Sequence, residues 1–213
     1  MDAILFDWDG TLVDSFEPLY RSNVAVLASY GIEVDGSSYR RAYTPDWRRM
    51  YIALGVPETA IEEAAERWRV AYGLGDGAAV FPGVAAALDR LASAGLRMGV
   101  VTAGDRRVVA EQARRFELDD LLPVRVHADD LPMTKPHPEP LRQALASLGV
   151  TDPSRAAYLG DVPDDMRMAR AVGTAAIGIV GRLGSPPELI AAGASAVFSS
   201  VVDWVDDFLA GRA

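Results

Sequence analysis

The sequence contains no cysteine, and this absence excludes disulfide bonds, thiolate metal sites and cysteine nucleophiles. Histidine is nearly as scarce, because the chain has only His127 and His137. We therefore do not expect a zinc site built from histidines.

Positive charge is also in short supply. The chain has 21 Lys and Arg against 30 Asp and Glu, a formal net charge of -9. A field of that sign repels phosphate backbones, so we do not expect nucleic acid as a partner. No apolar run approaches the ~20 residues that span a bilayer, so we expect no membrane partner. Residues 1–7 lack the basic and apolar regions of a signal peptide, and we expect a cytoplasmic protein whose oligomeric state the sequence does not indicate.

What is present is a globular composition, 50% hydrophobic and 24% charged over 213 residues, enough for one sizeable domain or for a core with a small insert. Short apolar runs typical of buried strands alternate with amphipathic helical segments from about residue 80 onward. The expected strands are 3–7, 96–102, 124–128, 156–160, 175–180 and 194–198. This alternation predicts an α/β fold with a Rossmann-like parallel sheet and helices on both of its faces.

One stretch interrupts the alternation. Residues 15–77 contain no convincing strand and predict a helix over 16–30, a second after Pro45 and a third after Pro57. The glycine-rich segment 73–77 is typical of a hinge. We therefore expect an all-helical cap over 15–79, inserted into a core made of 1–14 and 80–213.

The first predicted strand ends in two carboxylates, Asp7 and Asp9, followed by Gly10. Ligands of open parallel sheets bind beyond the carboxyl ends of the strands, so both side chains are candidates for one crevice. Gly10 permits the tight turn that this arrangement requires. The alternative is a polar turn in which an Asp caps a helix.

Two further strand ends carry groups that suit an anion. Thr102, Ala103 and Gly104 follow the second long strand and precede a helix, whose N–H groups favour negative charge. Lys135 follows the next strand, in a loop that three prolines stiffen. The alternatives are an ordinary turn with Asp105 as helix cap, and a solvated lysine.

Another carboxylate pair follows the strand at 156–160. Asp161 and Asp165 are four residues apart and face the same way if the turn between them is helical. Capping by Asp164 and Asp165 is an alternative for those two residues, but it explains Asp161 less well. Together the strand ends supply an acidic cluster, which needs a cation. Oxygen ligands without cysteine indicate Mg²⁺, and Mg²⁺ beside an anion cradle and a lysine indicates phosphoryl chemistry.

These motifs resemble those of the haloacid dehalogenase superfamily, and within it the small phosphatases with a helical cap, of the phosphoglycolate phosphatase type. Residues 7–15 match the first motif closely, Thr102 the second, Lys135 with Pro136 the third, and 160–165 the fourth, in the expected order. The resemblance spans residues 3 to about 200. One departure is visible: many such phosphatases have Asn after the Thr or Ser of the second motif, where this chain has Ala103 and Gly104.

The resemblance implies a role for each site residue. Asp7 is the nucleophile and Asp9 the general acid and base, while Thr102 and Lys135 hold the phosphoryl group with Ala103 and Gly104 beside it. Mg²⁺ is bound by Asp7, the backbone carbonyl of Asp9 and Asp161, with Asp165 in support. The implied activity is Mg²⁺-dependent hydrolysis of a small phosphorylated metabolite, phosphoglycolate by analogy, through an aspartyl-phosphate.

Other activities stay open at this point. A phosphosugar mutase would pass the phosphoryl group from the aspartyl-phosphate to a sugar hydroxyl instead of water. A signalling switch would keep a long-lived phospho-aspartate, although receiver domains are shorter and lack a helical insert. A dehalogenase is disfavoured, because the resemblance implies that those enzymes lack a carboxylate at the position of Asp9.

The helix expected after Pro45 leaves two arginines beside its apolar face. Arg48 and Arg49 are candidates for holding an anionic group of the substrate. The alternative is a solvated pair that offsets nearby acids, and the sequence favours it slightly. The apolar face itself is expected to bury Trp47, Met50, Tyr51 and Leu54.

Overall fold

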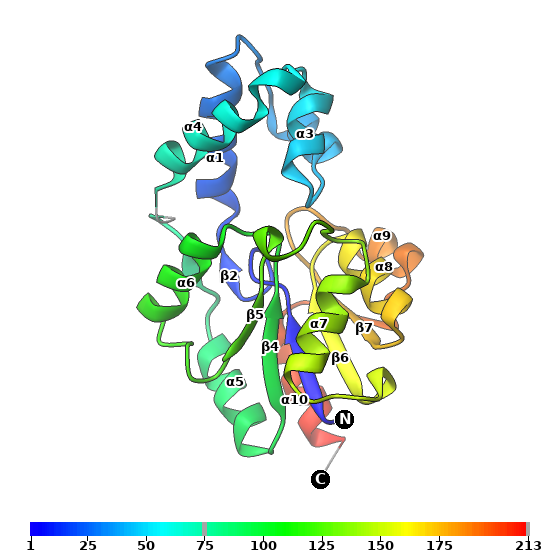
Figure 1. The fold of residues 1–213 in the computed structure, drawn as a ribbon. Helices are drawn as coiled ribbons and strands as arrows, with labels where there is room; N and C mark the ends of the chain where they lie inside the picture. Colours follow the sequence, from blue (N-terminus) through cyan, green and yellow to red (C-terminus); the bar gives the residue numbers. More distant parts are fainter. Residues whose placement is uncertain (74–75, 212–213) are drawn as a thin grey trace.

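A computed structural model describes residues 1–73 and 76–211 of the chain (Figure 1). Its main sheet has six described strands, all parallel, in the order β5-β4-β1-β6-β7-β8. Their bounds are β1 Ala3–Phe6, β4 Arg97–Val101, β5 Val124–Val126, β6 Ala156–Gly160, β7 Ala175–Ile179 and β8 Ala196–Phe198. The α/β fold class is thus confirmed, and each expected strand is present.

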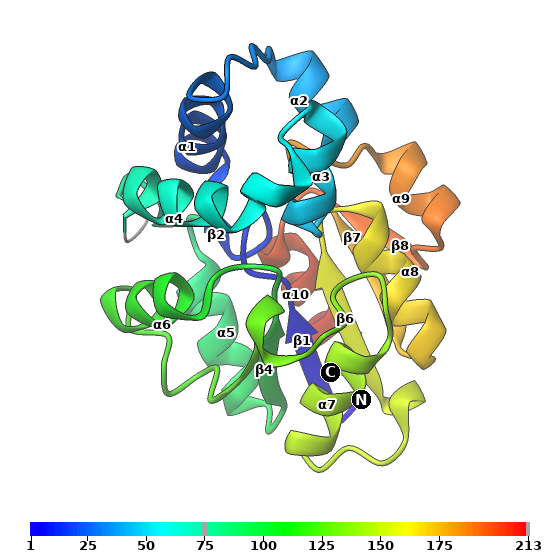
Figure 2. The ribbon, with the colours of Figure 1, turned by 45° about the horizontal axis from the view of Figure 1, so that its top comes forward.

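Helices cover both faces of this sheet, because its central strands are apolar on both sides (Figure 2). In β1, Ile4 and Phe6 face one hydrophobic cluster, while Ala3 and Leu5 face the other. The first cluster is completed by α5 Val84–Ser93, α6 Arg106–Arg115 and α10 Val201–Ala210, the second by α7 Glu139–Ser147, α8 Pro163–Val172 and α9 Pro186–Ala192.

The strand order creates a crevice beside β1. From β1 the chain builds β4 and β5 on one side, then crosses to place β6 on the other side. Loops that leave neighbouring strands in opposite directions open a crevice at the carboxyl edge of a parallel sheet. The ends of β1 and β6, where Asp7 and Asp161 lie, border that crevice.

The remaining helices lie between β2 (Val13–Asp14) and β3 (Ala79–Val80), which pair antiparallel. We call this segment the helical insert; it comprises α1 Phe16–Ala28, α2 Gly36–Ala42, α3 Trp47–Leu54 and α4 Ile61–Tyr72. The insert has a hydrophobic cluster of its own, which includes Leu27, Tyr51 and Ala64. Figure 1 shows it above the carboxyl ends of the strands, so it stands over the crevice.

Local signals explain the helix boundaries in the insert. Asp35 accepts a hydrogen bond from the Ser38 N–H and starts α2, and Asp46 accepts one from the Arg49 N–H and starts α3. Gly55, in the left-handed region, ends α3. Of the expected apolar face of α3, Met50 and Tyr51 are buried while Trp47 and Leu54 are half-buried.

Some features differ from the expectation. The sequence analysis did not foresee α2, because Tyr39 is its one buried residue and it has no apolar stripe. A short 3₁₀ turn, Glu58–Ala60, precedes α4. The hinge expected at 73–77 lies partly outside the described residues. Within the described ranges, no helix has the length and apolar character needed to cross a membrane.

Candidate active site

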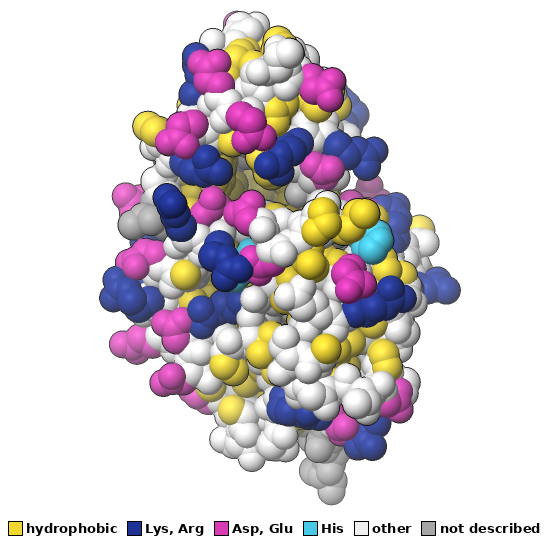
Figure 3. Space-filling view, viewed as in Figure 1, with side chains coloured by type: hydrophobic (Ala, Val, Ile, Leu, Met, Phe, Trp, Pro, Cys, Tyr) yellow, Lys and Arg dark blue, Asp and Glu magenta, His cyan; other side chains and the backbone are white. Residues whose placement is uncertain are grey.

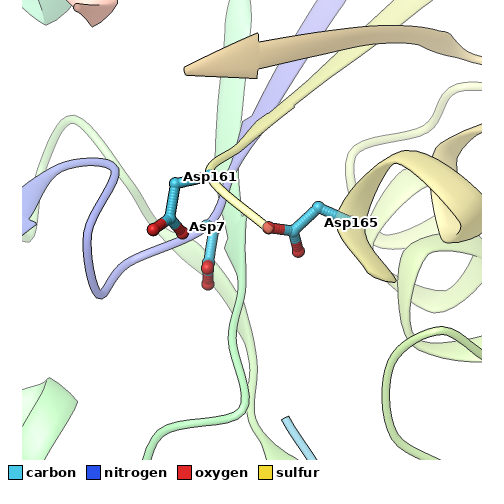
Figure 4. A group of neighbouring side chains, drawn as sticks. All are labelled: Asp7, Asp161 and Asp165. Carbon is cyan, nitrogen blue, oxygen red and sulfur yellow. The ribbon is translucent and has the colours of Figure 1, made fainter. Parts of the chain in front are cut away.

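Three buried carboxylates meet at the crevice between β1 and β6 (Figure 4). Asp7 directly follows β1, Asp161 directly follows β6, and Asp165 lies in the first turn of α8. One oxygen of each lies within 4.8 Å of the others. The parallel pairing of β1 with β6 brings the first two together, and the helical turn after Asp161 brings the third. We call Asp7, Asp161 and Asp165 the acidic trio.

Lys135 reaches the acidic trio from the loop before α7. Its Nζ lies 2.6 Å from Asp7 Oδ1 and 2.9 Å from Asp165 Oδ1. The lysine side chain is almost completely buried, with 2% of its surface exposed. The alternative of a solvated lysine is therefore wrong, because the ammonium forms ion pairs with both carboxylates.

Burial sets the charge state of these groups. It raises the pKa of Asp7 to about 7, although the charge of Lys135 opposes the rise. Burial also raises the pKa of Asp161 well above its ordinary value, and the neighbouring Asp7 and Asp165 add to the rise. Burial opposes the charged form of Lys135, but Asp165 and Asp7 outweigh it and raise the lysine pKa. Three carboxyl groups thus surround one ammonium, and a further cation would favour the ionised forms of Asp7 and Asp161.

The acidic trio has the properties of a site for a divalent cation. Asp161 Oδ2 is buried and has no hydrogen-bond partner among the described residues. A buried oxygen without a partner is costly unless a ligand satisfies it. The donors are carboxylate oxygens, the ligand type that Mg²⁺ prefers. The residues present therefore fit a hard divalent ion.

Asp9 occupies a different environment, although only Trp8 separates it from Asp7. It is half-buried, and its Oδ1 accepts a hydrogen bond of 2.6 Å from the Ser15 hydroxyl. Burial raises the pKa of Asp9, while the Ser15 hydrogen bond opposes the rise. The turn that follows depends on Gly10, whose φ is +80°. A Cβ at Gly10 would lie 2.5 Å from Asp161 Oδ2, so this backbone must pass the acidic trio without a side chain.

Thr102, Ala103 and Gly104 continue from β4 and line the same pocket as Asp7, Asp9 and Lys135. The Thr102 hydroxyl accepts a hydrogen bond of 2.9 Å from the Gly104 N–H. A Cβ at Gly104 would lie 3.3 Å from Asp9 Oδ2, which shows how closely this loop approaches Asp9. Asp105 accepts hydrogen bonds from the N–H groups of Arg107 and Val108, so it is the N-cap of α6. Thr102, Ala103 and Gly104 thus form part of the pocket wall.

The pocket extends upward from these residues to the helical insert and holds about 1140 Å³ of empty space, part of it open to solvent. Figure 3 shows the hollow between the insert and the sheet, with acidic and basic side chains along its rim. Six of the residues predicted from the sequence line this pocket: Asp7, Asp9, Thr102, Ala103, Gly104 and Lys135. Asp161 and Asp165 are not lining residues, but they contact the site through the acidic trio. Both arginines are exposed, but Arg48 lines the pocket and Arg49 is not among the lining residues.

Sequence reasoning did not foresee most of the insert side of this pocket, nor the part of α6 that lines it. Among the additional lining residues are Asn23, Tyr39, Tyr43, Trp68, Arg69, Tyr72 and Gln112. Their spacing follows helix faces, which in a sequence cannot be distinguished from ordinary core packing. Gln112 gave the best local signal, because it is a polar residue on the buried face of a helix.

Comparison with known proteins agrees with this geometry. A family model for haloacid dehalogenase-like hydrolases matches residues 4–179. A phosphoglycolate phosphatase of Rhodospirillum rubrum is 32% identical, over 95% of this chain and 90% of that protein. One of Haemophilus influenzae is 29% identical over 82% and 83%, respectively. The crystal structure of a predicted phosphatase from Clostridium acetobutylicum is 26% identical and superposes with a TM-score of 0.87 over 98% of each chain.

Proposed function

The chain belongs to the haloacid dehalogenase-like hydrolase family, and on that premise we propose that it is a Mg²⁺-dependent phosphatase that hydrolyses a small phosphomonoester through an aspartyl-phosphate on Asp7. One observation carries the proposal. Asp7 pairs with Lys135 in a pocket that is also lined by a loop suited to an anion, and two further carboxylates, Asp161 and Asp165, lie beside it. The curated relatives, named for phosphoglycolate, support a small phosphomonoester as the substrate.

The two carboxylate oxygens of Asp7 have different hydrogen bonds. Asp7 Oδ1 accepts from the Trp8 N–H at 2.7 Å and from Lys135 at 2.6 Å. No hydrogen bond engages Oδ2 among the described residues, and we propose that this oxygen attacks phosphorus. The P–O bond to the leaving alcohol breaks as the new P–O bond to Asp7 forms. Lys135 holds the nucleophile in place and lies where it stabilises charge on the phosphoryl oxygens.

The loop after β4 positions the phosphoryl group from the other side. Thr102 is buried at the pocket wall, and its hydroxyl is free to donate because it accepts the Gly104 N–H. Small residues at 103 and 104 let a phosphoryl group approach the backbone. We propose that Thr102, Ala103, Gly104 and Lys135 form the phosphoryl-binding wall.

Asp9 is placed to move the proton. Its raised pKa favours the protonated form needed to donate a proton to the leaving alkoxide. The resulting carboxylate then accepts a proton from the water that hydrolyses the aspartyl-phosphate. Ser15 anchors Oδ1, while Oδ2 lies on the side of Gly104 and the phosphoryl-binding wall. One carboxylate thus serves as the acid and then as the base.

The acidic trio supplies the proposed metal site. Asp7, the backbone carbonyl of Asp9 and Asp161 would hold Mg²⁺, with Asp165 in support. When bound, Mg²⁺ neutralises negative charge on the carboxylates and on the phosphoryl oxygens, which favours ionised Asp7 and the approach of an anionic substrate.

We further propose that 15–79 acts as a cap on a core made of 1–14 and 80–213. The helical insert roofs the pocket, and Arg69 in α4 pairs with Asp105 at the start of α6 across the opening, at 3.6 Å. Excluding water from such a pocket strengthens the electrostatic interactions inside it.

The test is inorganic phosphate release from a panel of phosphomonoesters, including p-nitrophenyl phosphate, ranked by kcat/KM in Mg²⁺. We expect turnover that EDTA stops and Mg²⁺ restores, and that Asp7→Asn abolishes while the variant remains folded. Transfer of the phosphoryl group to a sugar without phosphate release would instead identify a mutase. No turnover and a stable phosphoprotein would identify a signalling switch.

A further inference from the structure

The insert side of the pocket is aromatic. Six aromatic side chains line it, all from the helical insert: Tyr39, Tyr43, Trp47, Tyr51, Trp68 and Tyr72. We call this set the aromatic wall. Apolar side chains from α1, α3 and α6, among them Leu19, Met50 and Val109, extend the surface between the rings. Ligand sites lined in this way bind through buried apolar area.

Protein partners hold most hydroxyls of the aromatic wall. Tyr51 donates to Asn23 Oδ1 at 2.7 Å, and Asn23 Nδ2 donates to the Tyr39 hydroxyl at 3.0 Å. Gln112 Nε2 donates to the Tyr72 hydroxyl at 3.4 Å. Tyr43 differs, because its hydroxyl has no hydrogen-bond partner among the described residues. The wall therefore presents rings held by hydrogen bonds, and the hydroxyls of Tyr39, Tyr43 and Tyr72 can each still donate one hydrogen bond.

The cations that line the pocket already have carboxylate partners. Lys135 is committed to Asp7 and Asp165. Arg69 pairs with Glu66 at 3.0 Å and with Asp105 at 3.6 Å. Arg48 lies 3.8 Å from Glu62 and over the Trp47 ring, 4.5 Å from its centroid. Every Lys and Arg among the lining residues in the described ranges thus has a carboxylate within 4 Å.

Carboxylates that line the pocket also disfavour a second anionic group on the substrate. Asp129 lines the pocket on the core side, beyond the catalytic carboxylates, and so does Asp105, which is paired with Arg69. A second anionic group on the substrate would face them and would need an unpaired arginine or lysine to be bound well. A neutral apolar group would meet the aromatic wall instead, without any charge to desolvate.

We propose, building on the phosphatase function above, that the preferred substrate is the phosphate ester of an uncharged alcohol with a ring-sized apolar body, which packs against the aromatic wall. The phosphoryl group stays at Asp7, and the released alcohol lies under the insert. This selectivity differs from that expected for phosphoglycolate, whose leaving group is small and carries a carboxylate. It also opposes the sequence-based alternative in which Arg48 or Arg49 holds an anion.

The experiment compares primary-alcohol esters, for which leaving-group chemistry is similar. The probes are ethyl phosphate, phenethyl phosphate, the para-carboxy derivative of phenethyl phosphate, and phosphoglycolate. We expect kcat/KM for phenethyl phosphate to exceed that for ethyl phosphate by about tenfold or more, the scale of partly burying one ring. The added carboxylate should remove most of this gain, and phosphoglycolate should rank below phenethyl phosphate.

Matched variants assign the preference to the wall. Trp68→Leu shortens a wall residue that stacks on Tyr72, with ring centroids 4.8 Å apart, and should reduce the phenethyl-to-ethyl ratio severalfold. Tyr30→Leu changes an aromatic residue of the insert that is not among the pocket-lining residues, and should leave the ratio unchanged. Circular dichroism and thermal unfolding of both variants separate loss of selectivity from loss of fold.

Two failures are distinguishable. If no ester, including p-nitrophenyl phosphate, releases phosphate, the phosphatase function itself is wrong. If phosphoglycolate or the para-carboxy ester is turned over faster than phenethyl phosphate, and Arg48→Ala removes that advantage, the phosphatase stands and the neutral-substrate proposal is overturned. An unchanged phenethyl-to-ethyl ratio in Trp68→Leu also overturns it.

Discussion

Two carboxylates separated by one residue have unlike surroundings in this protein. Asp7 contacts a lysine and a backbone N–H and borders two other carboxylates. Asp9 contacts a serine hydroxyl at the side of the pocket. Groups of the same chemical type take different roles when their environments differ in this way, and the proposed roles are a nucleophile for Asp7 and a proton carrier for Asp9.

Asp9→Asn should separate the two half-reactions. An aryl phosphate has a good leaving group and scarcely needs an acid, so phosphorylation of Asp7 continues while hydrolysis slows by ~10²–10⁴. A rapid-quench assay should show a burst of phenol near one equivalent per enzyme, followed by little turnover. Equal slowing of both steps without a burst would contradict the dual role of Asp9.

Asp161→Ala should raise the Mg²⁺ concentration required for half-maximal activity, because it removes the buried oxygen that lacks a partner. Asp164→Ala is the matched control: Asp164 lies three residues along, pairs with Arg167 and is outside the acidic trio. Titration of Mg²⁺ into metal-free enzyme measures both. A similar metal requirement in wild type and Asp161→Ala would move the metal site elsewhere.

Gly10→Ala and Gly31→Ala distinguish backbone strain from collision with the site. Both glycines have positive φ, but a Cβ at Gly31 meets nothing within 4 Å, whereas one at Gly10 meets Asp161. We expect each variant to lose about 1 kcal/mol of stability from the left-handed backbone. Only Gly10→Ala should also lose activity. Urea unfolding and phosphate release, measured on both variants, check this; comparable activity in the two would show that Gly10 does not shape the site.

Residue by residue, the sequence predicts the pocket residues of the core but not most of those of the insert. Asp7 and Asp161 are readable because a carboxylate directly after a buried strand lies at a predictable edge. Tyr43 and Trp68 are not readable, because only the folded position of the insert brings them over Asp7.

Among the elements, the buried strands of the core are the most predictable. Strand β6, Ala156–Gly160, has the bounds expected from its apolar run, since a strand buried on both faces reads as uninterrupted hydrophobic residues. Strands β2 and β3 are two residues each, too short to show a period, and pairing between distant segments creates them. Helix α2 was missed because capping, and not an apolar stripe, defines it.

A hydrogen-bonded chain links the end of β1 to two helices. Trp8 Nε1 donates to Gln112 Oε1 at 2.7 Å, and Gln112 in α6 reaches Tyr72 in α4 at 3.4 Å. Gln112→Leu would leave the buried Trp8 N–H without its partner. We expect a loss of about 1–3 kcal/mol in the free energy of unfolding.

Tyr72→Phe is the matched comparison for Gln112→Leu. It removes only the longer hydrogen bond and keeps the ring, so its cost should be smaller. Thermal unfolding measures both, at about 2–4 °C per kcal/mol for a protein of this size. A larger loss in Tyr72→Phe than in Gln112→Leu would contradict the central place given to Gln112.

For the whole molecule, the position of the insert is the feature that the sequence left open. Composition and strand alternation predict that a helical segment interrupts the core. They do not predict that Arg69 in α4 pairs with Asp105 at the start of α6, or that the aromatic wall lines the same pocket as Asp7. This placement depends on contacts between segments distant in the chain, for which no local pattern exists.

The central claim is that the pocket between core and insert carries out phosphoryl transfer through Asp7. The most direct measurement is acid quench of Asp9→Asn during reaction with an aryl phosphate in Mg²⁺, followed by borohydride reduction and peptide mass spectrometry. Borohydride converts an aspartyl-phosphate to homoserine and leaves phosphoserine and phosphohistidine unreduced. We predict homoserine at position 7, in an amount that matches the phenol burst. Modification at any other residue, or phosphate release with position 7 unmodified, would contradict the account.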